Sequence, residues 1–153
     1  MIGGELISEP ALVSVESAGN DFTSWINTHS LPPDARGPMD DPDHDGVPNI
    51  LEYALATDPL QADRQQAMPK PILVRIDGKI HLACTYRQPK PTPADLTYQV
   101  TESPTIFPWT ASTTVIPMGS PVDKGDHLEY TVRAAQPVTA SVMGFLRLNV
   151  EKK

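Results

Sequence analysis

Apolar and polar side chains alternate along the C-terminal part of the chain. The clearest alternating runs lie at residues 72–76, 80–86, 96–100, 128–132 and 146–150. A period of two is typical of β-strands that bury one face and expose the other. Five or six strands joined by turn-rich connections indicate a β-sandwich. We therefore expect a mainly β fold, with a β-sandwich domain at residues 66–153.

The dipeptide Asp77-Gly78 predicts a hairpin between the first two strands. A two-residue turn would place the apolar residues of these strands on opposite faces of the sheet. A three-residue loop over residues 76–78, with Gly78 in the left-handed conformation, instead pairs Val74 with Ile80. We expect the three-residue loop, because a slip of one residue in register exposes a whole apolar face.

Residues 21–60 carry a helical pattern instead. Asp21 suits a helix N-cap, and it precedes three apolar residues with helical spacing, Phe22, Trp25 and Ile26. A second helix is predicted to begin at Pro48 or Asn49, since proline is tolerated in the first turn. Helices this short are unstable alone, so we expect the helical segment over residues 21–60 to pack against the β domain. Residues 1–20 contain one short apolar run and are predicted to be a linker or a short strand.

Composition limits the classes of protein that fit. The chain has 153 residues, of which 17 are proline, and a net charge of −7. Many prolines disfavour long helices, and an acidic chain without a basic face is a poor candidate for nucleic-acid binding. The sequence has no run of about 18 apolar residues, so no membrane span is expected. Its start lacks the pattern of a signal peptide, so for an exported protein we expect the signal to lie upstream.

Cys84 is the only cysteine and cannot form a disulfide within the chain. It alternates with Leu82 and Tyr86 on a predicted strand, which indicates a buried, inert thiol rather than a nucleophile. The four histidines lack the spacing of a zinc site, and no serine lies in a nucleophile-elbow pattern. The sequence gives no candidate catalytic residue, so we expect a protein that is not an enzyme.

The segment from Asp41 to Glu52 reads Asp-Pro-Asp-His-Asp-Gly-Val-Pro-Asn-Ile-Leu-Glu. Its acidic and amide residues have the spacing of a twelve-residue calcium loop. In such a loop, side chains at positions one, three, five, nine and twelve and the carbonyl at position seven bind the ion, and a glycine at position six allows the sharp turn. The predicted calcium ligands are Asp41, Asp43, Asp45, Val47 through its carbonyl, Asn49 and Glu52.

Other interpretations of this acidic segment are less favoured. An ordinary solvated turn would share its Asp, Asn, Gly and Pro residues, but would not require the distant Glu52. A transition metal would favour nitrogen or sulfur ligands. A regulated calcium sensor would carry a second loop, and an apolar residue rather than Pro48 at position eight. A hydrolase fragment could use the acidic cluster as paired carboxylates, but calcium ligation already accounts for those residues.

The loop resembles the calcium loops of thrombospondin type-3 repeats and of dockerins, which are similar to EF-hand loops. Further matching positions are Trp25, 41–46, Asn49, 52–55, 58–59, 102–109 and 144–148. With these residues most of the chain resembles the C-terminal calcium-loop and all-β accessory module of large bacterial secreted and cell-surface proteins, although His44 and Ala56 stand where glycine is expected. The resemblance implies a non-catalytic, calcium-stabilised module of an exported bacterial protein. It also implies a location outside the cell or at its surface, with an upstream domain of the same polypeptide as partner.

Trp109 is the remaining candidate for ligand binding. With Phe107 and Tyr98 nearby in the sequence, it could form a platform on which a sugar ring stacks. The alternative function is therefore a calcium-dependent carbohydrate-binding module, whose partner would be a glycan or another cell-surface component. Large aromatic side chains also pack in protein cores, and the sequence leaves both roles open for Trp109.

Overall fold

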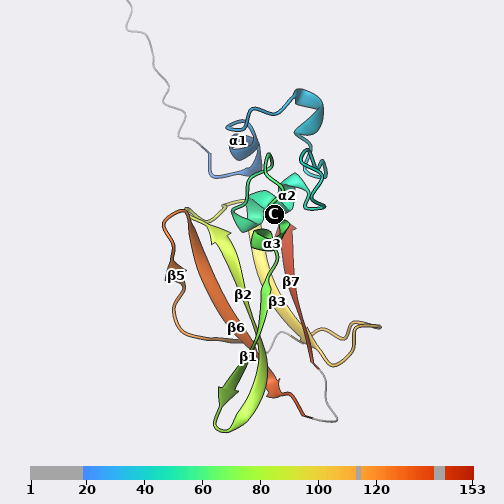
Figure 1. Cartoon of the computed structure of the whole chain (residues 1–153), viewed down its shortest axis with the longest axis vertical. Coiled ribbons are helices and arrows are strands. Elements are labelled where there is room, and N and C mark those ends of the chain that lie inside the picture. The colour runs from blue at the N-terminus through green and yellow to red at the C-terminus, as the bar shows by residue number, and fades with distance from the viewer. Residues whose placement is uncertain (1–18, 113–114, 140–143) are drawn as a thin grey trace, which may run out of the picture.

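The structure, a computed structural model, describes residues 19–112, 115–139 and 144–153. Its helices are α1 (Phe22–Ile26), the 3-10 helix η1 (Pro33–Ala35), α2 (Asn49–Leu55) and α3 (Arg64–Ala67). Its strands are β1 (Lys70–Ile76), β2 (Lys79–Pro89), β3 (Leu96–Ser103), β4 (Ile116–Pro117), β5 (Val122–Asp123), β6 (His127–Pro137) and β7 (Phe145–Lys152). The helices gather at one end and the long strands extend away from them (Figure 1). The fold is mainly β, as the alternation predicts. The predicted linker or short strand over residues 1–20 lies outside the described residues except for its last two positions.

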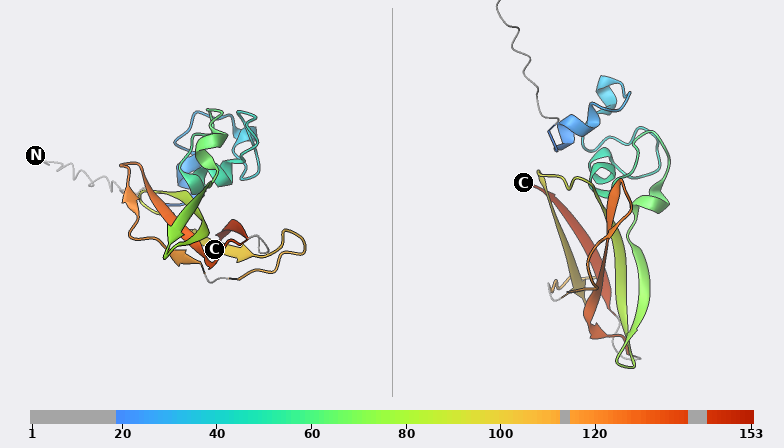
Figure 2. Two further views of the ribbon diagram at one scale, coloured as in Figure 1. Left: turned by 60° about the horizontal axis from the view of Figure 1, so that its bottom comes forward. Right: turned by 90° about the vertical axis from the view of Figure 1, so that its left-hand side faces the viewer.

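The strands form two antiparallel sheets. In the five-stranded sheet the order is β1-β2-β6-β4, and β5 also pairs with β6, while the second sheet is the pair of β3 and β7. Figure 2 shows the two sheets as separate layers. Side chains from both sheets form one apolar cluster, in which Cys84 and Tyr86 of β2 and Val132 of β6 join Val100 of β3. The alternating runs that contain these residues therefore bury one face in a core shared by both sheets.

A second apolar core joins the helical end to the strands. Its buried residues come from all three α-helices, from the loops and from β3, and include Phe22, Ile26, Tyr53, Ala54, Leu55, Ala67 and Leu96. Two tyrosine hydroxyls reinforce this junction. Tyr53 donates a hydrogen bond to Asp95 Oδ1 (2.8 Å), just before β3, and Tyr98 of β3 donates to the carbonyl of Ala54 (2.7 Å). The short helices are thus held by packing against strand residues.

The first and second α-helices begin where the sequence predicts. Asp21 caps α1 by accepting a hydrogen bond from the Ser24 amide (2.8 Å), and α2 begins at Asn49 directly after Pro48. Ala56 ends α2 in the left-handed conformation, with φ of 55°, which glycine adopts without strain. No helix in the described part of the chain combines the length and apolarity of a membrane span.

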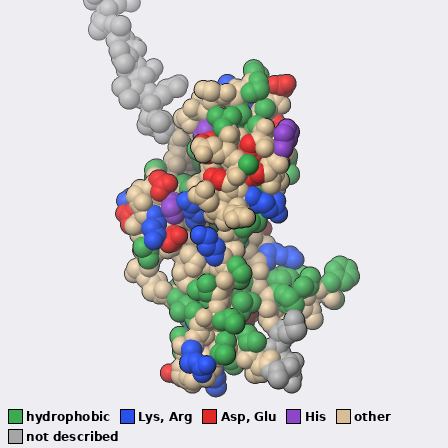
Figure 3. Space-filling model, in the orientation of Figure 1, with side chains coloured by type: hydrophobic (Ala, Val, Ile, Leu, Met, Phe, Trp, Pro, Cys, Tyr) green, Lys and Arg blue, Asp and Glu red, His purple; other side chains and the backbone are tan. Residues whose placement is uncertain are grey.

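The first hairpin differs from its predicted register. Ile76 pairs with Lys79, so the turn contains only Asp77 and Gly78, and both have positive φ (48° and 78°). Leu73 of β1 is 68% exposed, and hydrophobic side chains are visible over the part of the molecule where β1 and β2 lie (Figure 3). The prediction of a three-residue loop was wrong because β1 buries no apolar face that could impose a register. The preference of Asp-Gly for a two-residue turn decides the pairing instead.

Cys84 lies in the shared core of the two sheets, as predicted, and is 6% exposed. Burial raises the pKa of its thiol, so the reactive thiolate is both scarce and shielded. We expect Ellman's reagent to label Cys84 in the native chain more than about tenfold more slowly than in guanidinium-unfolded chain. Labelling at the same rate in both states would contradict this placement.

Candidate metal centre

The predicted calcium loop begins after η1 and continues into the first residues of α2, and hydrogen bonds close it at its base. The backbone N–H of Asn49 donates to the carbonyl of Asp40 (2.9 Å). The side chain of Asn49 is fully buried, and its amide nitrogen donates to the carbonyls of Ala35 (3.0 Å) and Gly37 (2.9 Å). Asn49 therefore fixes the segment before the loop to the first turn of α2, while its Oδ1 atom stays buried without a partner.

Gly46 occupies the sharp turn of the loop, with φ of 86°. A Cβ atom added there would lie 2.6 Å from Nη1 of Arg64. That atom of Arg64, the first residue of α3, donates to the carbonyls of Gly46 (3.1 Å) and Asp45 (3.4 Å). Position six of the loop thus favours glycine for its backbone conformation, and a larger residue there would also displace the end of the Arg64 side chain.

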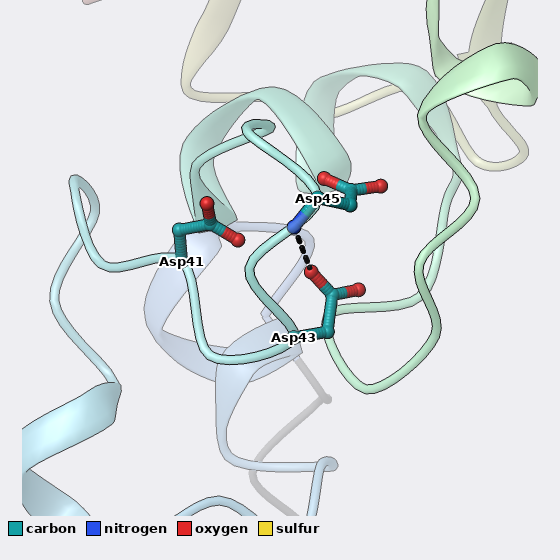
Figure 4. A group of neighbouring side chains, drawn as sticks. All are labelled: Asp41, Asp43 and Asp45. Atoms are coloured by element: carbon teal, nitrogen blue, oxygen red, sulfur yellow. Dashed lines mark hydrogen bonds between the residues drawn. The ribbon is translucent and has the colours of Figure 1, made fainter.

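Three loop aspartates each use one carboxylate oxygen to hold the backbone. Asp41 Oδ2 accepts from the Gly46 amide (2.9 Å), Asp43 Oδ1 from the Asp45 amide (3.1 Å) and Asp45 Oδ1 from the Val47 amide (2.8 Å). Figure 4 shows the three side chains around the loop, with the Asp43 bond drawn. The second oxygen of each carboxylate is buried without a hydrogen-bond partner. Each aspartate therefore leaves one oxygen for a cation, and the three side chains offer ligand atoms within 4.8 Å of one another.

Glu52, on α2, is the most deeply buried carboxylate of the site. Its side chain is 0% exposed, and neither carboxylate oxygen has a hydrogen-bond partner. Burial, followed by repulsion from Asp43 and Asp45, raises the pKa of Glu52 to about 8. Burying an ionised carboxylate costs free energy unless a positive charge lies beside it. A cation next to Glu52 would offset this cost.

Asp63, just before α3, joins the site although it lies outside the twelve-residue loop. It offers an oxygen within 4.8 Å of oxygens of Asp45 and Glu52. Its Oδ1 atom is buried without a partner, and burial raises the pKa of its carboxyl group. The loop spacing gives no reason to include Asp63, and its only sequence signal is an acidic residue near the end of an acidic stretch.

The geometry sorts the predicted ligands into overlapping groups. Asp41, Asp43 and Asp45 form one group, and Asp45 and Glu52 form a second group with Asp63. Within the described residues these are the sets of three or more potential ligands close enough to hold one ion, and every member offers oxygen. Oxygen ligands suit hard cations such as calcium and magnesium better than soft transition metals.

Trp109 is half-buried, and one face of its ring is covered. Cζ of Arg147 on β7 lies 4.0 Å from the ring centroid, and the indole nitrogen is buried without a hydrogen-bond partner. Phe107 is 92% exposed, whereas Tyr98 packs in the cores and bonds to Ala54. The indole ring of Trp109 therefore has at most one face open to a sugar. Tyr98 cannot contribute a second stacking ring, because its side chain packs in the two cores.

No protein-family model, curated protein or solved structure matches the chain. The arguments for function therefore come from the acidic site and from the way in which the helical end packs on the strands.

Proposed function

We propose that the chain is a non-catalytic module whose helical end is stabilised by bound calcium. The observation that carries this proposal is Glu52, a fully buried carboxylate whose two oxygens have no hydrogen-bond partner and which lies beside Asp45. Buried charges in proteins are paired or coordinate metals. A cation held between the loop and α2 would supply the missing charge.

Calcium fits this site better than other common cations. It takes six to eight oxygen ligands in flexible geometry. One free oxygen from each of Asp41, Asp43 and Asp45, the carbonyl of Val47 and both oxygens of Glu52 supply six, with Asn49 available through its unpartnered Oδ1 or through water. Magnesium requires a stricter octahedron and retains several waters, which so many protein oxygens would displace.

The position of the site supports a structural role. The loop continues into α2, which contacts β2 and shares a core with Leu96 of β3, and the carbonyl of Ala54 on α2 accepts a hydrogen bond from Tyr98 of β3. An ion that fixes the loop against α2 would therefore also fix the helical end against the strands. We further infer that the two sheets form a small β-sandwich, because side chains of both sheets share one core.

A stabilising ion is useful where calcium is constantly plentiful, which is outside the cell. This reasoning, together with the resemblance to accessory modules of bacterial exported proteins, supports an exported or cell-surface protein in which the module serves a domain of the same polypeptide. We assign the acidic residues of the site to binding the cation, and not to the paired-carboxylate role that a hydrolase would require. Carbohydrate binding is less favoured because Arg147 covers one face of Trp109.

The test is thermal unfolding with and without calcium. At free calcium about 100 times the dissociation constant, the ion should stabilise the chain by about 2.7 kcal/mol. For a chain of this size we expect the melting temperature to rise by roughly 5–10 °C when calcium is added after a chelator. Magnesium at the same concentration is the control and should give a smaller shift. An unchanged melting curve, with no bound metal in elemental analysis, would refute the proposal.

A further inference from the structure

Asp63 stands at the N-cap position of α3 but does not cap the helix. Its side chain makes no capping hydrogen bond, although this is the usual role of an aspartate there. Its Oδ1 atom is buried without a partner, and no lysine or arginine in the described ranges forms an ion pair with it. Arg64, the next residue, donates to loop carbonyls instead. Burial raises the pKa of Asp63 although the charge of Arg87 acts to lower it, so among the described residues this carboxylate has a cation in its surroundings but no direct ion pair.

Two groups of three carboxylates meet at Asp45. The first group adds Asp41 and Asp43, the second adds Glu52 and Asp63, and the ligand atoms within each group lie within 4.8 Å of one another. Oxygen ligands lie 2.3–2.6 Å from a calcium ion, so two ligands of the same ion are at most about 5 Å apart. Each group is therefore about as wide as one coordination sphere, and the two spheres share Asp45.

The second group contains Glu52, the most buried carboxylate of the cluster. Its side chain has no exposed surface, and neither of its two carboxylate oxygens has a hydrogen-bond partner. No aspartate of the loop is so completely buried. With a second ion present, one oxygen of Glu52 would bind each ion, and Asn49 Oδ1, which is also buried without a partner, would take the place of the second Glu52 oxygen at the loop ion.

The charge of the cluster favours two ions over one. When all five carboxylates of the two groups are ionised, they carry five negative charges. One divalent cation offsets two of these charges, and two divalent cations offset four. Because these carboxylates lie close together and repel one another, two cations leave a net charge of −1 where one cation leaves −3, and the shared carboxylates between the cations offset the repulsion of one cation by the other.

We propose that Asp45, Glu52 and Asp63 hold a second calcium ion beside the loop ion, and that Asp45 bridges the two ions. This inference rests on the proposed function, because it adds an ion to the same acidic cluster. The second ion joins α3 to α2, and α3 ends at Ala67, three residues before β1 begins at Lys70. It therefore links the loop to the start of the first strand.

The test counts the calcium ions bound by the full chain, using isothermal titration calorimetry and native mass spectrometry after removal of metal with a chelator. We expect two ions for the wild type and one for Asp63→Asn. Asp77→Asn is the matched control, because it removes the same charge from an exposed aspartate in the turn between β1 and β2, where asparagine before glycine suits the same turn. The control should still bind two ions.

A wild-type chain that binds one ion, or an Asp63→Asn variant that still binds two, would overturn the second site and leave the proposed function standing. A wild-type chain that binds no calcium would overturn both. Circular dichroism and the slow labelling of Cys84 establish that the variant is folded. An ion lost from a folded variant then reports a lost ligand rather than lost structure.

Discussion

Replacing Glu52 by glutamine is expected to weaken calcium binding by about 100-fold or more, which corresponds to about 2.7 kcal/mol of binding free energy. The same change should make the calcium-free chain more stable, by on the order of 1–2 kcal/mol. Both effects have one cause. Glu52 is fully buried with two unpartnered oxygens, so its negative charge is favourable when the ion is bound and unfavourable without it.

Denaturant unfolding of wild type and Glu52→Gln, each in calcium and in chelator, measures both effects. The order of stability should reverse between the two conditions. Glu151→Gln is the control, since it removes the charge of an exposed glutamate on β7. A variant that is less stable than wild type in both conditions would show that Glu52 serves packing rather than a cation.

The calcium-free chain should also respond to pH through Glu52. Its pKa is raised from 4.5 to about 8 in the folded chain. Between these values the unfolded chain has released the proton while the folded chain retains it, so rising pH favours unfolding. In chelator we therefore expect the contribution of Glu52 to stability to be fully present below pH 4.5 and to be lost as the pH rises to about 8, and we expect Glu52→Gln to lack most of this fall.

Replacing Phe22 by alanine is expected to cost about 3–5 kcal/mol of unfolding free energy. Phe22 is 5% exposed, and its ring centroid lies 5.9 Å from that of Trp25 and 5.8 Å from that of Tyr53. The cavity would open in the core that α1 and α2 share with β3. Because strand residues line this core, we expect the helices and strands to unfold together.

Urea unfolding followed by circular dichroism and by Cys84 labelling measures this effect. The two probes should give one transition, shifted to lower urea in Phe22→Ala. Phe107→Ala is the matched control, because it removes the same side chain from a position that is 92% exposed, and it should change stability by less than about 0.5 kcal/mol. Two separate transitions in the wild type would indicate that the helical end is an independent unit.

Local signals explain what could be predicted from the sequence. The N-cap at Asp21 and the start of α2 after Pro48 depend on neighbouring residues, and both were correct. The mainly β character follows from alternation, which needs no knowledge of strand partners. The three loop aspartates come together because a short loop gives them few alternatives.

Features that depend on distant parts of the chain could not be predicted. The hairpin register was wrong because the sequence does not reveal that β1 is largely exposed. Asp63 reaches Glu52 only because the chain turns back after α2, and no spacing rule describes that path. Arg147 covers Trp109 through a contact between β7 and a loop 38 positions earlier in the sequence.

Glu52 and Tyr53 are adjacent on α2 but serve different parts of the molecule. The carboxylate of Glu52 belongs to the acidic cluster, while the hydroxyl of Tyr53 bonds to Asp95 at the start of β3. Any rotation of α2 that adjusts the carboxylate must also displace the hydroxyl, because the two side chains share one rigid turn of backbone. A shift of α2 on ion binding would therefore reach Asp95, just before β3, through the hydroxyl of Tyr53.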